Sequence, residues 1–416
     1  MFNLSIPVYI RFVFGFVFML ACTETQQPKK EVTVIAGGDV VWCRDVKAPG
    51  IYFGTKNDSK LYREDKWRRL PFIATDQSIK HIEEKFEKKL IDSTSHHINS
   101  ILYPLSFDNK DDEAIYPFKK IAATLKIADL AFVNLETPLS DFARNSGSFR
   151  TPTHFAKGLL YGGVDVISTA NNHAFDCEGE GIRDTYTTLK KAGLASIGTG
   201  ENLQEARKPF IFIKNGIKLA FFAYTYGVNP TITPLGFALP DQSGAVPLDP
   251  FLMKADIQSV RDKVDFVLLS FHWGLENKRE IHPAAREFAH EILDAGADAI
   301  IGHHPHVPRG IEIYKGKPII YSLGNLIFGH NHTYWGDNLL VKMTLTPEGI
   351  TRLEVIPVAG EGEDVTQPYV LTGTRADTLL KDIQNRSLEL NTKMEIEGET
   401  GFITIHSAEE NQVGSN

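Results

Sequence analysis

Short apolar runs rich in β-branched residues recur along the sequence and alternate with stretches of helical spacing. Because both faces of these runs are apolar, they suit strands of a sheet that is covered by helices. The runs lie at residues 32–36, 130–135, 164–168, 218–224, 264–270, 297–301 and 318–321. Between them, residues 181–192 and 284–295 have helical spacing and end at Gly193 and Gly296, as helices often do. The alternation predicts an α/β domain in which helices flank layered β-sheet.

Two segments interrupt this alternation. Residues 45 to about 118 form a charged insertion after the first strand, and a connection of that length is typical of a segment that covers a site. Residues 338–358 predict a β-hairpin, and a helix is expected near residues 377–389. We therefore predict a main domain over residues 32–330 and a C-terminal hairpin and helical extension over residues 331–416.

The N-terminus has the features of an export signal. A lone arginine precedes an apolar run at residues 12–21, about the length of a secretory hydrophobic region and short for a bilayer span. The run ends in Met19-Leu20-Ala21-Cys22, which resembles a bacterial lipobox with its acylated cysteine. We predict a signal peptide over residues 1–21, lipidation at Cys22 and a polar tether over residues 22–31. The chain is then an extracytoplasmic, membrane-anchored lipoprotein, and an uncleaved anchor helix is the alternative.

Composition narrows the class of protein. The formal net charge of −8, with Lys and Arg interspersed, argues against a nucleic-acid-binding surface, which usually presents a basic stripe. Hydrophobic residues make up 42% and charged residues 23%, as in soluble globular domains. Beyond Cys22, only Cys43 and Cys177 remain, too few for a disulfide scaffold, although an exported protein can pair them.

Polar residues follow the predicted strands, and the carboxyl ends of strands are where open α/β sheets build their sites. Some of these signals are weak alone. Gly38-Asp39 is also a common turn, and a carboxylate such as Glu136 also caps helices. The Gly-Asn turn at Asn325 is either structural or bonds a ligand.

Three segments carry a sharper signal. Residues 170–176 place two amides, an imidazole and a carboxylate directly after a strand. His272 ends another apolar run, with Gly274 permitting close approach of the backbone. Residues 302–306 contain three histidines after a buried-type strand, and the alternation of His304 and His306 directs two rings into one space. Since imidazole is the commonest metal ligand, the clusters predict a divalent-metal site.

Together these motifs resemble the CapA family, which is associated with poly-γ-glutamate capsule synthesis and is similar to the calcineurin-like metallophosphoesterase superfamily. The resemblance covers about residues 32 to 328. It is carried by Gly38-Asp39 with Arg44, Asn134-Leu-Glu136, Ala170-Asn-Asn-His173 with Asp176, His272-Trp-Gly274, Gly302-His-His-Pro-His-Val307 and Tyr321-Ser-Leu-Gly-Asn325. It implies a metallophosphatase-like layered sandwich and a role in capsule biosynthesis.

The resemblance also implies two metal positions. One metal is expected on Asp39 and His306, and the other on Asn172, His272 and His304, with Glu136 as the bridging carboxylate. The remaining motif residues are His173 for proton transfer or substrate contact, Asp176 to orient it, and Arg44, Asn134, His303 and Asn325 for substrate binding. Mn, Fe and Zn each suit this mixed oxygen and nitrogen ligand set.

The sequence departs from the superfamily pattern at its opening Asp-x-His motif, where Val41 replaces the histidine; Glu178 likewise replaces a family glycine. Two functions therefore stay open. One is a metal-dependent hydrolase of phosphoester or polymer amide bonds, and the other is a non-catalytic component of capsule assembly or export that binds metal or anionic polymer. The expected partners are the membrane, an anionic polymer or phosphoester substrate, and membrane capsule-synthase subunits.

Overall fold

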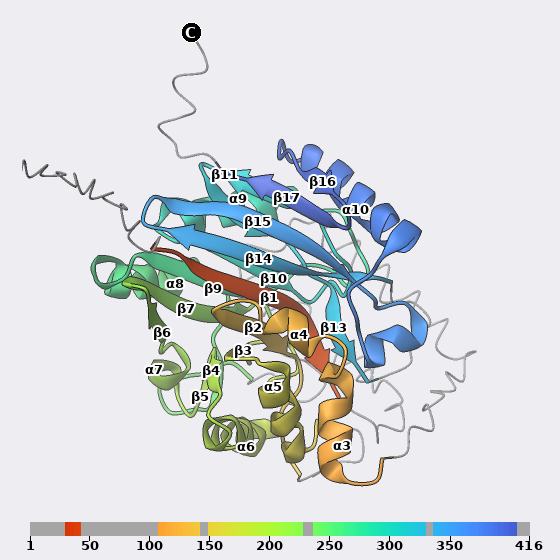
Figure 1. Cartoon of the computed structure of the whole chain (residues 1–416). Helices are drawn as coiled ribbons and strands as arrows, with labels where there is room; N and C mark the ends of the chain where they lie inside the picture. The colour runs from red at the N-terminus through yellow and green to blue at the C-terminus, as the bar shows by residue number, and fades with distance from the viewer. Residues whose placement is uncertain (1–29, 43–106, 142–148, 228–235, 330–335, 406–416) are drawn as a thin grey trace, which may run out of the picture.

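The computed structural model describes residues 30–42, 107–141, 149–227, 236–329 and 336–405. The predicted fold class is confirmed, because two β-sheets pack face to face and helices cover their outer faces (Figure 1). The predicted signal peptide, Cys22, Cys43, Arg44 and most of the predicted insertion lie outside the described residues.

The larger sheet has nine strands. Their order is β16 (Glu395–Glu397), β17 (Thr400–Thr404), β15 (Gly349–Val358), β14 (Asn338–Thr346), β1 (Val32–Val41), β2 (Leu130–Leu135), β3 (Val166–Ser168) and β4 (Ala195–Ile197), while β13 (Asn325–Phe328) pairs with the end of β1. The predicted hairpin is present as β14 and β15, and β14 pairs antiparallel with β1. The C-terminal strands therefore extend the same sheet that the first strand begins (Figure 1).

The smaller sheet has six strands, and a two-stranded sheet lies apart from it. The order is β11 (Ile311–Tyr314), β12 (Lys317–Ile320), β10 (Ala299–His303), β9 (Phe266–His272), β7 (Ile217–Thr225) and β6 (Phe210–Lys214), and the pair is β5 (Thr199–Gly200) with β8 (Gly244–Ala245). Strands β7, β9, β10 and β12 are parallel neighbours. Their apolar side chains are buried on both faces, which explains the continuous apolar runs in the sequence.

Helices complete the layers. The outer face of the larger sheet packs against α4 (Ala122–Leu125), α5 (Ala156–Gly162) and α6 (Glu178–Lys191), and α3 (Lys110–Ile115) packs on α5. The outer face of the smaller sheet packs against α8 (Pro250–Val260) and α9 (Pro283–Asp294). Helix α10 (Gly373–Leu388) packs its apolar side into the core between the sheets. The short helices are α7 (Leu203–Ala206), η2 (Tyr116–Phe118), η3 (Thr153–Phe155), η4 (Arg261–Lys263) and η5 (Gly362–Thr366).

Local sequence explains where the longer helices begin and end. Helix α8 begins after Asp249, whose side chain accepts hydrogen bonds from two backbone N–H groups of the first turn. Helix α9 begins with Pro283 at its first position. The predicted helices at residues 181–192, 284–295 and 377–389 correspond to α6, α9 and α10. Gly193 and Gly296, just beyond two of them, have φ of 79° and 116°, which favour glycine.

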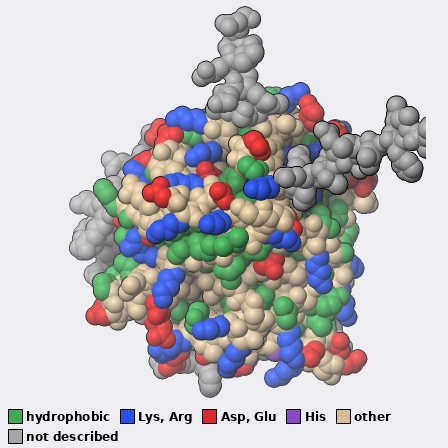
Figure 2. All heavy atoms as spheres, turned by 60° about the vertical axis from the view of Figure 1, so that its left-hand side comes forward, with side chains coloured by type: hydrophobic (Ala, Val, Ile, Leu, Met, Phe, Trp, Pro, Cys, Tyr) green, Lys and Arg blue, Asp and Glu red, His purple; other side chains and the backbone are tan. Residues whose placement is uncertain are grey.

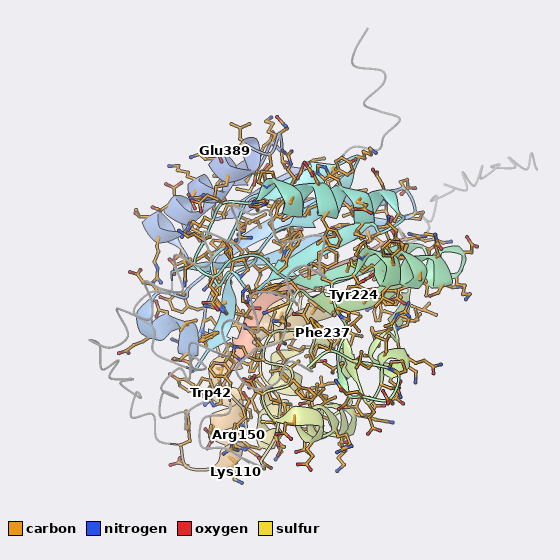
Figure 3. All side chains as sticks on the ribbon, turned by 180° about the vertical axis from the view of Figure 1, so that it is seen from behind. Trp42, Lys110, Arg150, Tyr224, Phe237 and Glu389 are labelled. Carbon is orange, nitrogen blue, oxygen red and sulfur yellow. The ribbon has the colours of Figure 1, made fainter. Side chains whose placement is uncertain are left out.

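The end of β1 is held closely by its neighbours. A Cβ added to Gly38 would lie 2.0 Å from the carbonyl oxygen of Gly324, so only glycine permits this approach. Beyond Asp39, Trp42 stacks on Phe155 with ring centroids 6.0 Å apart, and its backbone N–H donates to the Thr151 hydroxyl. Figure 3 shows Trp42 in the same part of the molecule as Arg150. These contacts fix the segment that carries Asp39.

The surface and the helices bear on the predicted environment of the chain. Within the described ranges, no helix combines the length and apolarity needed to cross a bilayer. Acidic and basic side chains are interspersed over the face shown in Figure 2.

Cys177 lies half-buried at the start of α6, and burial raises the pKa of its thiol to about 12, so the thiol stays protonated near neutral pH.

Candidate metal centre

Strand ends from both sheets bring the predicted site residues together. The larger sheet supplies Asp39 at the end of β1, Asn134 and Glu136 at the end of β2, the segment 171–173 after β3, and Asn325 at the start of β13. The smaller sheet supplies His272 at the end of β9, and His303 with the following residues at the end of β10. All of the predicted ligands that the structure describes therefore lie in one cluster between the two sheets.

The first group of donors centres on His272. Its Nε2 atom lies 2.8 Å from Asn172 Oδ1, 3.1 Å from His304 Nδ1 and 3.4 Å from Glu136 Oε1. The donor atoms of Glu136, His272 and His304 all lie within 4.8 Å of one another. These four residues are the ones predicted to share one metal position, and the structure brings them together.

The second group consists of Asp39, Glu136 and His306. His306 Nδ1 lies 3.5 Å from Asp39 Oδ2, and His306 Nε2 lies 3.7 Å from Glu136 Oε1. Donor atoms of all three lie within 4.8 Å of one another. Glu136 belongs to both groups, which is the placement that a bridging carboxylate requires.

Glu136 tests whether these residues suit a cation. Its side chain is only 1% exposed, and neither carboxylate oxygen accepts a hydrogen bond from any residue that the structure describes. Burial raises its pKa to about 8, with His306 opposing the rise and Asp39 adding to it. A buried carboxylate without hydrogen bonds is costly unless a positive charge compensates it. The donor set is therefore compatible with a divalent metal site.

The electrostatics prepare the other ligands to bind a cation. Burial lowers the pKa of His272 and His304 well below its usual value, so both rings are neutral and keep a free lone pair. Burial alone raises the pKa of Asp39, but the neighbouring His303, His306 and His272 outweigh it and hold that pKa well below its usual range. Asp39 is therefore ionised.

Hydrogen bonds to the far side of each ring select the nitrogen that faces the cluster. Asn134 Nδ2 lies 3.3 Å from Nδ1 of His272, Asn325 Oδ1 lies 2.8 Å from Nδ1 of His306, and the Tyr226 hydroxyl lies 2.9 Å from Nε2 of His304. The remaining ligand atoms are Nε2 of His272, Nδ1 of His304 and Nε2 of His306. Asn325 Oδ1 and the Tyr226 hydroxyl can each accept a ring N–H, so these two contacts orient the rings of His306 and His304 and fix their tautomers. The Asn134 amide instead donates to Nδ1 of His272, so it orients that ring without placing the proton on Nδ1.

Three of the residues predicted to bind substrate lie against the predicted metal ligands. Asn134, His303 and Asn325 are fully buried. Asn134 Nδ2 donates to Asp39 Oδ1 at 2.8 Å, and His303 Nδ1 lies 3.5 Å from the same oxygen. These three side chains therefore contact the ligands themselves, and Arg44 lies outside the described residues.

The loop after β10 is strained. His304 and His306 have φ of 92° and 57°, a left-handed region that costs a residue other than glycine about 1–3 kcal/mol. With Pro305 between them, this backbone brings the centroids of the two rings to 5.9 Å from each other. The sequence alternation predicted that both rings share one space, and the structure confirms it.

His173 and Asp176 lie at the edge of the cluster. His173 Nδ1 lies 2.8 Å from Asp176 Oδ2, and the His173 ring stacks on Phe149 with centroids 4.4 Å apart. Burial alone lowers the pKa of His173, but the charges of Asp176, Glu136 and Glu276 outweigh it and raise that pKa to about 9. His173 is 20% exposed and protonated near neutral pH. It is suited to donate a proton.

Sequence reasoning gave no role to three residues of the site. Glu276 forms a third group of close donor atoms with His304 and His306. Tyr226 bonds the His304 ring, and Phe149 stacks on His173. Glu276 lies four residues after His272, and this spacing was the available signal. Nothing in the sequence pointed to Tyr226 or Phe149.

Comparisons with known proteins show which family the sequence matches. The sequence model of the family described as Bacterial capsule synthesis protein PGA_cap matches residues 33–330. The PGA biosynthesis protein CapA of Bacillus subtilis is 32% identical over 249 residues, which cover 58% of this chain and 64% of that protein. The capsule biosynthesis protein CapA of Bacillus anthracis is 31% identical, with 58% and 61% covered. The chain thus spans less than two thirds of the length of either relative.

Solved structures are more distant. The sulfate thiohydrolase SoxB of Thermus thermophilus aligns with a TM-score of 0.38 and 13% identity over 82% of this chain and 56% of that chain. The calcineurin-like phosphoesterase YfkN of Bacillus subtilis aligns with a TM-score of 0.27 and 11% identity over 88% and 100%. At these scores, the likeness adds nothing to the sequence matches.

Proposed function

The chain belongs to the PGA_cap family of bacterial capsule synthesis proteins, and we propose that it acts in poly-γ-glutamate capsule synthesis as a lipid-anchored, metal-dependent hydrolase. The bond it cleaves is a phosphoester or an amide of the polymer. The observation that carries the proposal is Glu136, a buried carboxylate without hydrogen bonds from the described residues, shared by two groups of ligand atoms. A carboxylate so placed suits two cations better than it suits a protein interior.

The residues divide into those that hold cations and those that act on substrate. Asp39, Glu136 and His306 hold one position, while Asn172, His272, His304 and Glu136 hold the other. Divalent cations bound there, with Mn, Fe and Zn all suitable, supply Lewis acidity and attract an anionic substrate.

His173 is the proton donor in this proposal. Asp176 engages Nδ1 of its ring, which leaves Nε2 to give a proton to the leaving group as water attacks the phosphorus or carbonyl carbon and the scissile bond breaks. Its raised pKa of about 9 keeps the ring protonated near neutral pH. Phe149 stacks on the ring and limits its rotation.

Turnover by the purified full chain tests the hydrolase. With Mn²⁺, we expect cleavage of bis(p-nitrophenyl) phosphate or of poly-γ-glutamate, and chelation with EDTA should abolish it. The His173→Gln variant should lower kcat about 100-fold, because the proton donor is lost. The matched control His282→Asn changes the exposed histidine that caps α9, where asparagine also serves as a cap, and should retain turnover. Bound metal with no cleavage of either substrate would overturn the hydrolase.

The second candidate function is a non-catalytic component of capsule assembly or export that binds metal or anionic polymer. Val41 favours it. This residue, in place of the histidine that the resemblance implies, is fully buried in an apolar cluster with Phe328 and Val365. Retention of metal and polymer by the chain without release of cleaved product would support this candidate.

The membrane anchor is a separate part of the proposal, supported by the lipobox-like Met19-Leu20-Ala21-Cys22. We expect the Cys22→Ala variant to lose acylation, measured as incorporation of labelled palmitate in the native host. Acylation that persists in Cys22→Ala would contradict the assigned lipidation site. This location suggests membrane capsule-synthase subunits as partners, and cross-linking in the host tests that contact.

A further inference from the structure

The two metal positions of the proposed centre are unequal. The one around His272 has four protein residues, Glu136, Asn172, His272 and His304. The one around His306 has three, Asp39, Glu136 and His306. The second position thus has one protein ligand fewer than the first, and since divalent transition metals take at least four ligands, it has room for another.

Glu276 is the carboxylate placed to complete it. Its side chain has an oxygen in a group with donor atoms of His304 and His306, all within 4.8 Å of one another. It is partly buried and comes from the loop that follows β9, away from the strand ends that carry Asp39 and Glu136. We propose that Glu276 is a metal ligand that completes the Asp39–Glu136–His306 position.

Among the described residues, neither β1 nor β13 supplies a further ligand on the other flank of His306. Val41, Phe328 and Val365 form a buried apolar cluster, and the Phe328 ring lies edge-on to the His306 ring at 5.3 Å. This flank of His306 is therefore lined by carbon rather than by donor atoms. A further protein ligand on this position therefore comes from another direction, and the loop of Glu276 lies there.

The backbone around Glu276 is tied to the histidine loop. The N–H of Asn277 donates to the carbonyl oxygen of Pro305 at 2.8 Å, directly between His304 and His306. The backbone N–H of Trp273, three residues before Glu276, donates to the carbonyl oxygen of His303 at 3.1 Å. The residues before and after Glu276 are thus each bonded to the segment that carries its two histidine neighbours.

A buried arginine holds the same loop from beneath. Arg309 is 3% exposed and donates through Nε to the carbonyl oxygen of Lys278 at 2.8 Å and through Nη2 to that of Leu275 at 3.2 Å. Gly274 makes room for it, since a Cβ there would lie 2.6 Å from Arg309 Nη1. Arg309 therefore positions Glu276 by bracketing it with two hydrogen bonds. A lysine cannot make both bonds in this fork geometry.

The charge of the centre supports this role. Asp39, Glu136 and Glu276 together bring three negative charges to two divalent cations, which leaves a small net positive charge. Such a site holds its cations while still attracting an anionic chain. Without Glu276 the two cations repel each other with less compensation, and the three-ligand position is the one that loses its metal.

Metal counting in the full chain, purified in detergent, tests the inference, which rests on the proposed metal centre. After equilibrium dialysis with Mn²⁺ alone, we expect two ions per wild-type chain and an exchange-coupled signal in electron paramagnetic resonance. In Glu276→Gln we expect one tightly held ion, loss of the coupled signal and a second Kd weakened at least about 10-fold. Glu280→Gln, which removes an exposed carboxylate from the same loop, should match wild type.

The possible outcomes separate the two proposals. Two ions with unchanged affinity in Glu276→Gln would overturn the role of Glu276 and leave the metal centre standing. A wild-type chain that binds no Mn²⁺, Fe²⁺ or Zn²⁺ would overturn both. The ion that remains in Glu276→Gln shows that the variant is folded. Arg309→Lys should weaken the second ion in the same way and leave the first unchanged, as expected of a residue that positions Glu276.

Discussion

Replacement of Glu136 with glutamine is expected to remove both cations and to reduce turnover to that of the chelated protein. Among the residues that the structure describes, Glu136 is the one that belongs to both the His272 group and the Asp39–His306 group of donor atoms. An amide has no negative charge to offset two divalent cations, so both positions lose their main compensation. Metal analysis of the purified variant after dialysis, alongside turnover, measures the effect.

The stability of the metal-free variant provides an independent check. The Glu136 carboxylate is buried without hydrogen bonds from the described residues, so its neutral replacement should leave the chelated protein as stable as wild type or more stable. The matched control is Glu312, a buried carboxylate that binds Arg286, His290 and Tyr321 away from the metal centre. Glu312→Gln should lower Tm and keep both cations. Full metal content in Glu136→Gln would show that Glu136 does not bridge the cations.

The sequence predicted the central strands because parallel strands buried on both faces leave continuous apolar runs. Each predicted run corresponds to a strand, among them β2 at Leu130–Leu135 and β9 at Phe266–His272. Strands β6 and β16 were not predicted. Their side chains are largely exposed or half-buried, and they pair at the edges of the sheets. Edge strands are defined by pairing with distant segments, so local sequence patterns carry little information about them.

The ligands of the candidate site were predictable for a related reason. Asp39, Glu136 and His272 lie at or just beyond carboxyl ends of strands, and the order of strands in an α/β sheet brings such ends together. The places of Asn134 and Asn325 were not predictable as found, since their contacts with Asp39 and His306 depend on distances between strands.

Glu276 illustrates the limit of sequence reasoning most clearly. Its place beside His304 and His306 depends on the Asn277–Pro305 hydrogen bond and on Arg309, which lies 33 residues along the chain from Glu276. No periodicity or local motif encodes such a long-range clamp. The residue type and its nearness to His272 were visible in the sequence, but the direction of the loop was not.

Metal affinity is expected to fall as the pH is lowered from about 8 to about 6. Burial raises the pKa of Glu136 to about 8, and Glu136, Asp39 and Glu276 outweigh burial to raise the pKa of His306. Glu136 therefore holds a proton in the metal-free protein below about pH 8, the raised pKa of His306 favours its protonated ring, and a cation has to displace these protons. For each proton that the metal displaces, the apparent Kd for Mn²⁺ rises about 10-fold per pH unit as the pH falls, or about 100-fold from pH 8 to pH 6. Calorimetric titration with Mn²⁺ in buffers of different ionisation enthalpy measures both the Kd and the protons released.

The same groups set the stability of the chelated protein, with the sign fixed by linkage. Above pH 6.5 the unfolded chain has released the proton that Glu136 holds in the folded state up to about pH 8, and the raised pKa of His306 acts in the same direction, so the folded state binds more protons. His173, whose pKa is raised to about 9, acts in the same direction, so the stability declines as the pH rises from about 6.5 to about 9. Asp39, with its depressed pKa, is ionised in both states over this range and adds no slope. In the titration with Mn²⁺, a Kd that does not change with pH, together with no proton release on binding, would mean that Glu136 is already ionised and that the metal-free site is hydrated.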